Sequence, residues 1–170
     1  MRNAVAVLPV VLVLLLAGGG VADAQPAAGQ RIFVVGRVED PTATITAHGV
    51  VNGIGTLTAE SVDFNQADKS YVETDLATVG DGTLTVVVHG AFDTWPFTLD
   101  PATCTRLGRI TGTWTITNAG GDLAGATGGG TLSGRFFTYA TRGPSGCNVN
   151  EIKGVVAGPM VGNVHRAAMS

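Results

Sequence analysis

Glu60 is an acidic residue in a strand-like segment, and its side chain could exchange a proton with a bound molecule if it faced the interior. Glu60 lies in the segment 55–64, in phase with Val62 and Phe64 if that segment is a regular strand. A carboxyl on an interior face would lose its hydration, and its pKa would rise toward the range that suits proton transfer. A slip in strand register, or exposure of the side chain to solvent, would remove this property. Both alternatives stay open for Glu60.

His89 is the second side chain of this kind. It ends the run TVVVH at residues 85–89, and strand alternation allows it to face either the interior or the solvent. As a simple strand-end histidine it would have no chemical role. We therefore name Glu60 and His89 as the candidate proton donors or acceptors.

Other catalytic and metal-binding patterns do not occur in the sequence. The histidines show no H-x-H or H-E-x-x-H spacing, and the two cysteines have no third ligand nearby. There is no G-x-S-x-G motif, and the carboxylates are dispersed rather than paired for glycoside hydrolysis. We therefore expect no metal site and no cofactor.

Three aromatic side chains are the candidates for contact with an apolar ligand: Trp95, Trp114 and Tyr139. Aromatic rings supply a large apolar area, and the indole and phenol groups add one polar atom each. Packing in the core is the alternative role for these residues. The sequence alone does not choose between a pocket and a core.

Cys104 and Cys147 are the two cysteines of the chain. In an exported protein such a pair indicates one disulfide bond. The bond would close a loop of about 44 residues and contribute about 3–4 kcal/mol in the chain-entropy account. Both cysteines lie in turn-like sequence, DPATC and GPSGCN, so we expect a link between two loops rather than between two sheets.

Residues 1–24 have the pattern of a secretory signal peptide. Arg2 precedes an apolar run, and Ala22 and Ala24 supply the small residues that a signal peptidase requires. The apolar run is too short to span a bilayer, and the glycines at 18–20 weaken it. We expect cleavage before Gln25, no integral membrane segment afterwards, and a secreted or extracytoplasmic location in the cell envelope.

The composition favours an all-β protein without nucleic-acid binding. The formal net charge is −3 and the cations form no cluster, so neutralisation of a phosphate backbone is not supported. Only 14% of the residues are charged, whereas glycine occurs 25 times and valine and threonine are abundant. Valine and threonine suit a half-buried pleated surface, and glycine suits turns and bulges.

The pattern of alternation predicts a single domain over residues 31–162. Asp81 and Gly82 form a strong hairpin signal between two of its strands. Residues 25–30 are expected to form a flexible leader, and residues 163–170 a C-terminal tail. We predict a small antiparallel β-barrel of about eight or nine strands with one disulfide, with a β-sandwich as the alternative. The expected strands are 31–39, 42–49, 55–64, 70–79, 83–92, 95–99, 109–117, 130–140 and 151–162.

A glycine-rich segment carries a resemblance to known proteins. No helix pattern follows its glycines, as a phosphate-binding loop would need. The segment GTWTITNAGGDLAGATGGGTLSGRF resembles one found in bacterial secreted β-barrel proteins, which are similar to the allene oxide cyclase and dirigent-like barrels. The resemblance covers residues 98–134. Its matched positions are Cys104, Gly112, Trp114, Ile116, Gly121, Ala124, Gly125, Ala126, Thr127, Gly128, Gly130 and Gly134.

This resemblance implies a fold and no specific activity. The sequence departs from the pattern at NAGGD and at Leu123, where an aromatic residue is usual. The glycines are architectural in these proteins, and no catalytic residue lies in the matched segment. We expect an exported, non-catalytic barrel that binds a small apolar molecule or a cell-envelope component. The alternative is a cyclase or isomerase that works in an apolar barrel pocket. The oligomeric state is not determined by the sequence.

Overall fold

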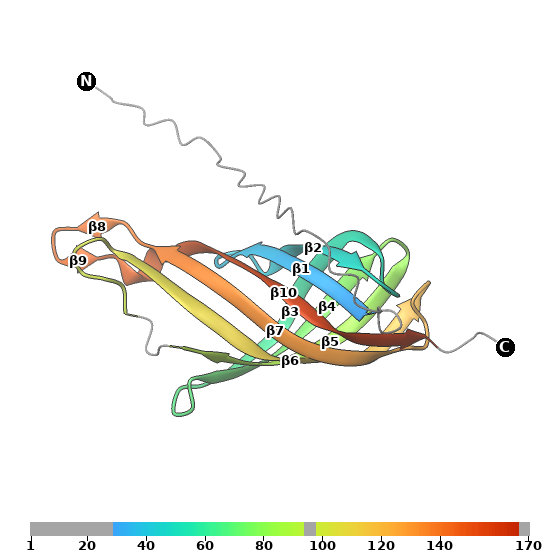
Figure 1. Cartoon of the computed structure of the whole chain (residues 1–170). Coiled ribbons are helices and arrows are strands. Elements are labelled where there is room, and N and C mark those ends of the chain that lie inside the picture. Colours follow the sequence, from blue (N-terminus) through green and yellow to red (C-terminus); the bar gives the residue numbers. More distant parts are fainter. Residues whose placement is uncertain (1–28, 94–97, 167–170) are drawn as a thin grey trace, which may run out of the picture.

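The computed structural model describes residues 29–93 and 98–166, and these form one closed antiparallel β-barrel (Figure 1). Eight strands make the barrel, and alternation of buried and exposed residues runs along most of them. Their bounds are β1 (Gly29–Arg37), β2 (Thr42–His48), β3 (Gly53–Asn65), β4 (Ser70–Val79), β5 (Gly82–Phe92), β6 (Thr105–Gly121), β7 (Ala126–Tyr139) and β10 (Lys153–Arg166).

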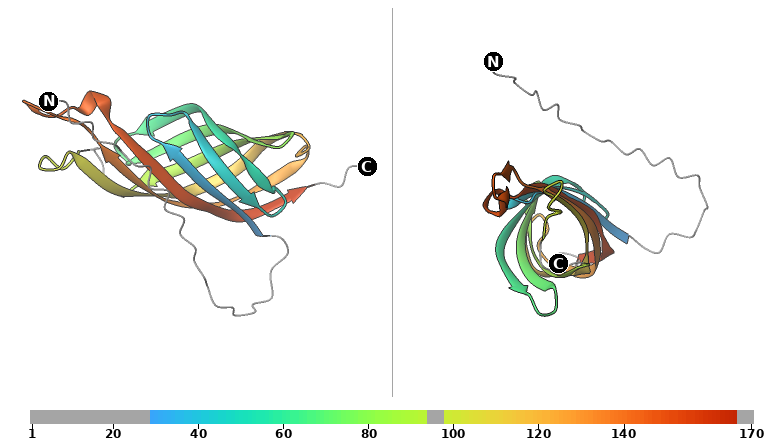
Figure 2. Two further views of the ribbon diagram at one scale, coloured as in Figure 1. Left: turned by 90° about the horizontal axis from the view of Figure 1, so that it is seen from above. Right: turned by 90° about the vertical axis from the view of Figure 1, so that its left-hand side faces the viewer.

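Strands that are neighbours in the barrel are also consecutive among its eight strands along the chain. β10 closes the sheet by pairing with both β7 and β1, as the view along the barrel shows (Figure 2, right). Closure gives each of these eight strands two neighbours, and antiparallel sheets otherwise have unpaired edges to protect. The end of β3 is an exception, because residues 59–65 extend beyond β2 and pair with β4 alone. The predicted all-β barrel is confirmed, and the closed sheet excludes the sandwich.

The predicted disulfide is present and joins two loop regions. The Cα atoms of Cys104 and Cys147 lie 5.4 Å apart. Cys104 precedes β6, and Cys147 belongs to a small hairpin made of β8 (Arg142–Gly143) and β9 (Gly146–Cys147). A single 3-10 turn, η1 (Val149–Glu151), then leads into β10. In the same region Arg142 donates hydrogen bonds to the carbonyl oxygens of Pro101 and Ala102.

The glycine-rich segment forms the walls and one turn of the barrel. β6 ends at Gly121, whose φ of +56° lies in the left-handed region that favours glycine. β7 starts again at Ala126, and residues 128–130 pair with β10 on one side and β6 on the other. These glycines therefore lie within regular strand pairing.

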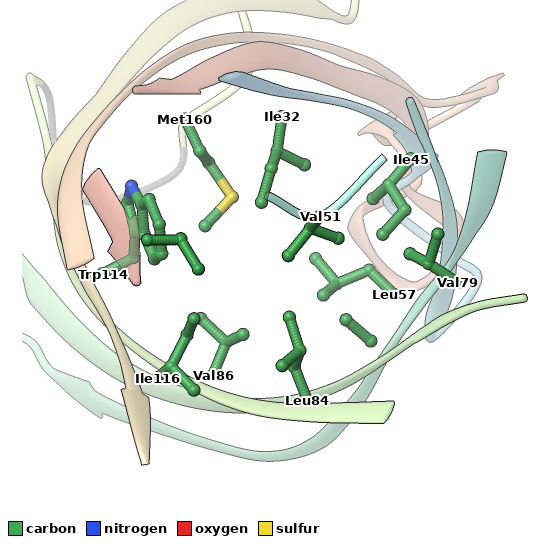
Figure 3. A pocket seen from close by; sticks show the side chains of 12 residues that line it. Ile32, Ile45, Val51, Leu57, Val79, Leu84, Val86, Trp114, Ile116 and Met160 are labelled. Carbon is green, nitrogen blue, oxygen red and sulfur yellow. The ribbon is translucent and has the colours of Figure 1, made fainter. Parts of the chain in front are cut away.

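Apolar side chains fill the half of the barrel in which β5 begins and β6 ends (Figure 3). Trp114 is 1% exposed there, and the remaining void is only about 10 Å³, about the space of one water molecule. The loop after β2 closes this end, because the Gln30 side chain bonds both the N–H and the C=O of Val51. The side chains around the void are Ile32, Ile45, Val51, Leu57, Ala77, Val79, Leu84, Val86, Trp114, Ile116, Met160 and Val164.

Several expected boundaries differ from the structure. The barrel begins at Gly29, so Gln30 of the expected flexible leader is a buried structural residue, and β10 continues to Arg166 beyond the expected end at residue 162. Residues 98 and 99 belong to no strand, and the rest of the expected strand 95–99 lies outside the described residues. The predicted signal peptide 1–24 also lies outside them. In the described part of the chain, no helix has the length and apolar character to cross a bilayer.

Candidate functional site

The other half of the barrel contains a cavity of about 800 Å³ that opens to solvent. It lies at the end where β4 begins and β7 ends, beside the β8–β9 hairpin. Leu57 and Met160 separate it from the packed half, because both side chains also line the small void there. Its volume lies within the range of small-molecule sites, about 300–1,000 Å³.

Most of the cavity surface is apolar. A group of rings forms one side: Tyr71 lies 5.1 Å from Phe92 between ring centroids, and Phe92 meets the edge of Phe136 at 5.9 Å. Tyr71 fits because Gly90 on the neighbouring strand has no side chain, since a Cβ there would come within 2.2 Å of the tyrosine ring. Aliphatic lining comes from Val34, Leu57, Val88, Ile110, Leu132, Val156 and Met160.

Two carboxyl groups of β4 face this apolar interior. Glu73 and Asp75 alternate in phase with Tyr71 and Ala77, so all four side chains share the inner face. Asp75 is only 3% exposed, and no hydrogen-bond donor reaches its carboxyl within the described residues. A carboxylate that has lost most of its hydration and has no protein partner is unfavourable, so this carboxyl on the cavity wall has free hydrogen-bonding capacity toward the cavity.

Burial changes the acidity of this carboxyl pair. Loss of hydration raises the pKa of Asp75 from 3.8 to about 7, and the nearby charges of Glu73 and Glu60 add to the rise. Burial also raises the pKa of Glu73. Tyr71 follows the same trend, since burial and then the two carboxylates raise the pKa of its hydroxyl. Asp75 therefore exchanges its proton near neutral pH.

Glu60 lines the cavity, but not as regular alternation predicts. Ala59 pairs with Asp75 and the next residue to pair is Ser61, which leaves Glu60 as the extra residue of a β-bulge. Its side chain is exposed at the opening. Because of the bulge, residues on both sides of it face inward: Leu57 and Ala59 before it, Val62 and Phe64 after it. Both alternatives that the sequence left open for Glu60 are therefore found: the strand register slips at this residue, and its side chain is exposed.

A second charged group lies at the opening. Glu39 accepts a hydrogen bond of 3.0 Å from the backbone N–H of Gly154 and lies 3.9 Å from Arg37. Backbone N–H groups, its own and that of Gly154, lower the pKa of the Glu39 carboxyl, and Arg37 adds a smaller effect. Arg106, 9% exposed, lies over the Phe136 ring at 5.5 Å.

The other candidates from the sequence lie away from the cavity. His89 is exposed on the outer face of β5, opposite Val72 and Thr113 on its neighbours. Tyr139 is 45% exposed on the outer face, with its ring 6.2 Å from that of Phe137. Trp114 packs in the closed half, where its Nε1–H has no hydrogen-bond partner. Trp95 lies outside the described residues. Glu60 is thus the one described candidate that lines the cavity.

Sequence reasoning did not identify Tyr71, Glu73 and Asp75 as site residues. A signal was present, because Tyr71, Ala77 and Val79 share their strand phase with both carboxyl groups. The usual assumption that charged residues face solvent hides this signal. Only the burial of this face shows that the acids belong inside.

No protein-family model, curated protein or solved structure matches the chain.

Proposed function

We propose that the protein is an exported, non-catalytic barrel that binds a small apolar molecule in the open half of its interior. The cavity of about 800 Å³, with its apolar and aromatic lining, is the observation that carries this proposal. The contrast with the packed half supports it, because one half of the same barrel is filled by its own side chains. Apolar surface left open to water is unfavourable, and a ligand would remove that cost.

Probe binding by a matched pair of variants tests the binding proposal. Val156 lines the cavity, whereas its neighbour Val155 is 49% exposed on the outer face. We expect the neutral fluorophore N-phenyl-1-naphthylamine to bind the wild-type protein and the Val155→Trp variant equally. Val156→Trp should weaken binding about tenfold or more, because the indole occupies the cavity. Equal binding by both variants, or no binding by the wild type, would overturn the proposal.

Native mass spectrometry of the protein from its own culture supernatant tests export and carriage together. We expect a chain that begins at Gln25 and lacks two hydrogens because of the disulfide. An added mass that disappears on denaturation would identify the bound molecule. A chain retaining residues 1–24, found only inside the cell, would contradict the proposed extracytoplasmic location.

A reaction in the same cavity is a second candidate function. The observation that favours it is the burial of Asp75 in the cavity lining. Burial raises the pKa of this carboxyl to about 7, so the group suits proton transfer at neutral pH. A cyclisation or isomerisation of the apolar ligand would use this group together with the cavity's shape. In that case Asp75→Asn would still bind the identified ligand but would no longer convert it. Recovery of the ligand unchanged from the wild-type protein would exclude this function.

The outer surface supports association with the cell envelope. Neighbouring strands β1, β10, β7 and β6 contain no Asp or Glu, and their outward cations stand among exposed apolar side chains such as Phe33, Phe137 and Leu107. Cations beside apolar groups favour an anionic, partly apolar surface. The outward cations of these strands include Arg31, Arg109, Arg135 and Lys153. Flotation with anionic but not with zwitterionic vesicles would support this association, and equal flotation would contradict it.

A further inference from the structure

We propose that the cavity selects an apolar molecule carrying a protonated amine, whose ammonium group is held by the carboxylates of Glu73 and Asp75. This inference rests on the proposed binding function and names the chemical class of the ligand. It depends on three observations: the position of the carboxyl pair, the charges around the cavity, and the apolar space beside the pair.

The first observation is that the two carboxyl groups lie on the same wall of the cavity. Glu73 and Asp75 are two residues apart on one strand, so both carboxyl groups project from the same inner face. The Asp75 side chain is only 3% exposed, and within the described residues no group donates a hydrogen bond to its carboxyl. A buried carboxylate needs a charged or hydrogen-bonding partner, and an ammonium group offers three donors and a positive charge. A ligand in the cavity would therefore supply the partner that the protein does not.

The charges around the cavity favour a cation over an anion. Carboxyl groups from three segments of the chain line it: Glu73 and Asp75 on β4, Glu60 on β3, and Glu39 and Asp40 in the loop after β1. Arg37 is a cation in this lining and lies beside Glu39, and the buried cation Arg106 lies over the ring of Phe136. The carboxyl groups outnumber these two cations. A ligand with a carboxylate would meet repulsion at the inner pair, because like charges near one another are unfavourable.

Apolar space next to the pair accommodates the rest of the ligand. Val88 pairs directly with Glu73 across β4 and β5, and Ile110, Leu132 and Phe136 line the same cavity. A chain or ring system bearing an amine would place its apolar part against these side chains. The shifted acidity agrees with this arrangement, since the pKa of Asp75 is raised by burial in the absence of a cation and should fall when one binds.

Three ligands of equal chain length test the inference: decylammonium, decanol and decanoate, each displacing N-phenyl-1-naphthylamine at pH 8. We expect decylammonium to bind about 30-fold more tightly than decanol, the ratio that corresponds to about 2 kcal/mol, and decanoate to bind most weakly. Equal affinities would overturn the inference and leave the proposed function standing. Failure of the fluorophore itself to bind would overturn the proposed function.

Substitutions of Glu73 and Asp75 test whether these carboxyl groups cause the preference for decylammonium over decanol. Asp75→Asn and Glu73→Gln should each remove most of the preference for decylammonium while decanol binding, which also reports correct folding, stays within about twofold. Asp63, an exposed carboxylate on β3, provides the matched control, and Asp63→Asn should keep the full preference. Retention of the preference in both cavity variants would contradict the assignment.

The pH dependence separates a charged pair from a neutral hydrogen-bond donor. Groups facing Asp75 are Tyr71 and Glu73 on its own strand and Glu60 on β3, while β5 presents the apolar Val86 and Val88. Decylammonium remains protonated from pH 5.5 to 8, so ionisation of Asp75 should raise its affinity about tenfold over this interval. A decanol affinity that instead rises as pH falls would show that protonated Asp75 is the recognition group, and would overturn the inference.

Discussion

At the scale of single residues, the carboxyl of Asp75 is buried at a cost in free energy, and this burial gives the cavity its acidic group. Asp75 could face solvent if β4 were shifted by one residue, but that shift would also turn Tyr71, Ala77 and Val79 outward. The apolar residues of the strand thus decide its orientation, and the carboxyl groups follow. Residues held in unfavourable surroundings by their neighbours are frequent at functional sites.

This burial predicts how stability depends on pH. The folded-state pKa of Asp75 lies above its ordinary value, so the folded protein binds more protons than the unfolded chain at intermediate pH. The free energy of unfolding should therefore fall as pH rises from about 4 to about 7, by up to about 1.4 kcal/mol per pH unit from this group. Asp75→Asn should flatten that dependence and raise stability at pH 8 by up to about 4 kcal/mol, which is this slope summed over about three pH units. Urea unfolding at pH 4.5 and pH 8 measures both quantities.

The same exposed carboxylate serves as the control here. Asp63→Asn should leave the pH dependence of unfolding as it is in the wild-type protein. Parallel pH curves for wild type and Asp75→Asn would show that Asp75 does not titrate near neutral pH.

At the scale of the elements, the bulge in β3 decides what the wall of the cavity contains. Without an extra residue, strict alternation could not direct Leu57, Ala59, Val62 and Phe64 to the same face. The bulge places Glu60 at the opening, where its carboxyl is exposed, and keeps Ala59 opposite Asp75. The bulge therefore keeps the carboxyl group of β3 at the opening, away from the inner wall that holds Glu73 and Asp75.

Two single-residue deletions test this account. Deleting Glu60 removes the bulge and keeps Ala59 opposite Asp75, so the free energy of unfolding should change by about 1 kcal/mol or less. Deleting Thr58 also removes the bulge but brings Glu60 opposite Asp75 on the inner face. That variant should be less stable by about 2 kcal/mol or more at pH 8, with a smaller difference at pH 4.5, where the carboxyl groups are protonated. Thermal unfolding of both variants provides the comparison.

The substitution Thr58→Ala controls for the lost side chain, which makes an exposed hydroxyl contact of 3.3 Å with Thr42. Equal stability of the two deletions at both pH values would contradict the role given to the bulge.

At the scale of the whole molecule, closure and the disulfide act on different parts. Pairing of β1 with β10 closes the barrel without covalent help, because no barrel strand is joined to another by the Cys104–Cys147 bond. The disulfide instead ties the β8–β9 hairpin to the segment before β6, beside the open end of the cavity. Its main effect should be on the unfolded chain.

Replacing both cysteines by serine tests this division. For a sequence separation of 43 residues, the chain-entropy account predicts a loss of about 3–4 kcal/mol in the free energy of unfolding. Far-ultraviolet circular dichroism should still show the β spectrum of the closed barrel in the absence of denaturant. Loss of that spectrum under native conditions would mean that the disulfide is needed for closure.

The sequence by itself determined the positions of the eight barrel strands and the disulfide, because both depend on local signals, whereas the expected strand 95–99 is not found at residues 98 and 99. Alternation, the hairpin signal at Asp81 and Gly82, and the pairing of two lone cysteines are readable without knowledge of distant contacts. Strand ends were less certain, since Gln30 and residues 163–166 gain their places only from long-range pairing. The expected all-β barrel therefore agrees with the structure more closely than its expected limits do.

Only the tertiary structure decided which faces turn inward and which half of the barrel is filled. Side-chain alternation has two possible phases on every strand, and burial of the whole sheet selects one of them. That selection placed Glu73 and Asp75 inside, left His89 and Tyr139 outside, and packed Trp114 in the closed half. The open cavity arises because side chains from seven of the eight strands meet around a small void in one half, whereas the side chains of the other half leave a large space between them. No local sequence pattern contains this difference in volume.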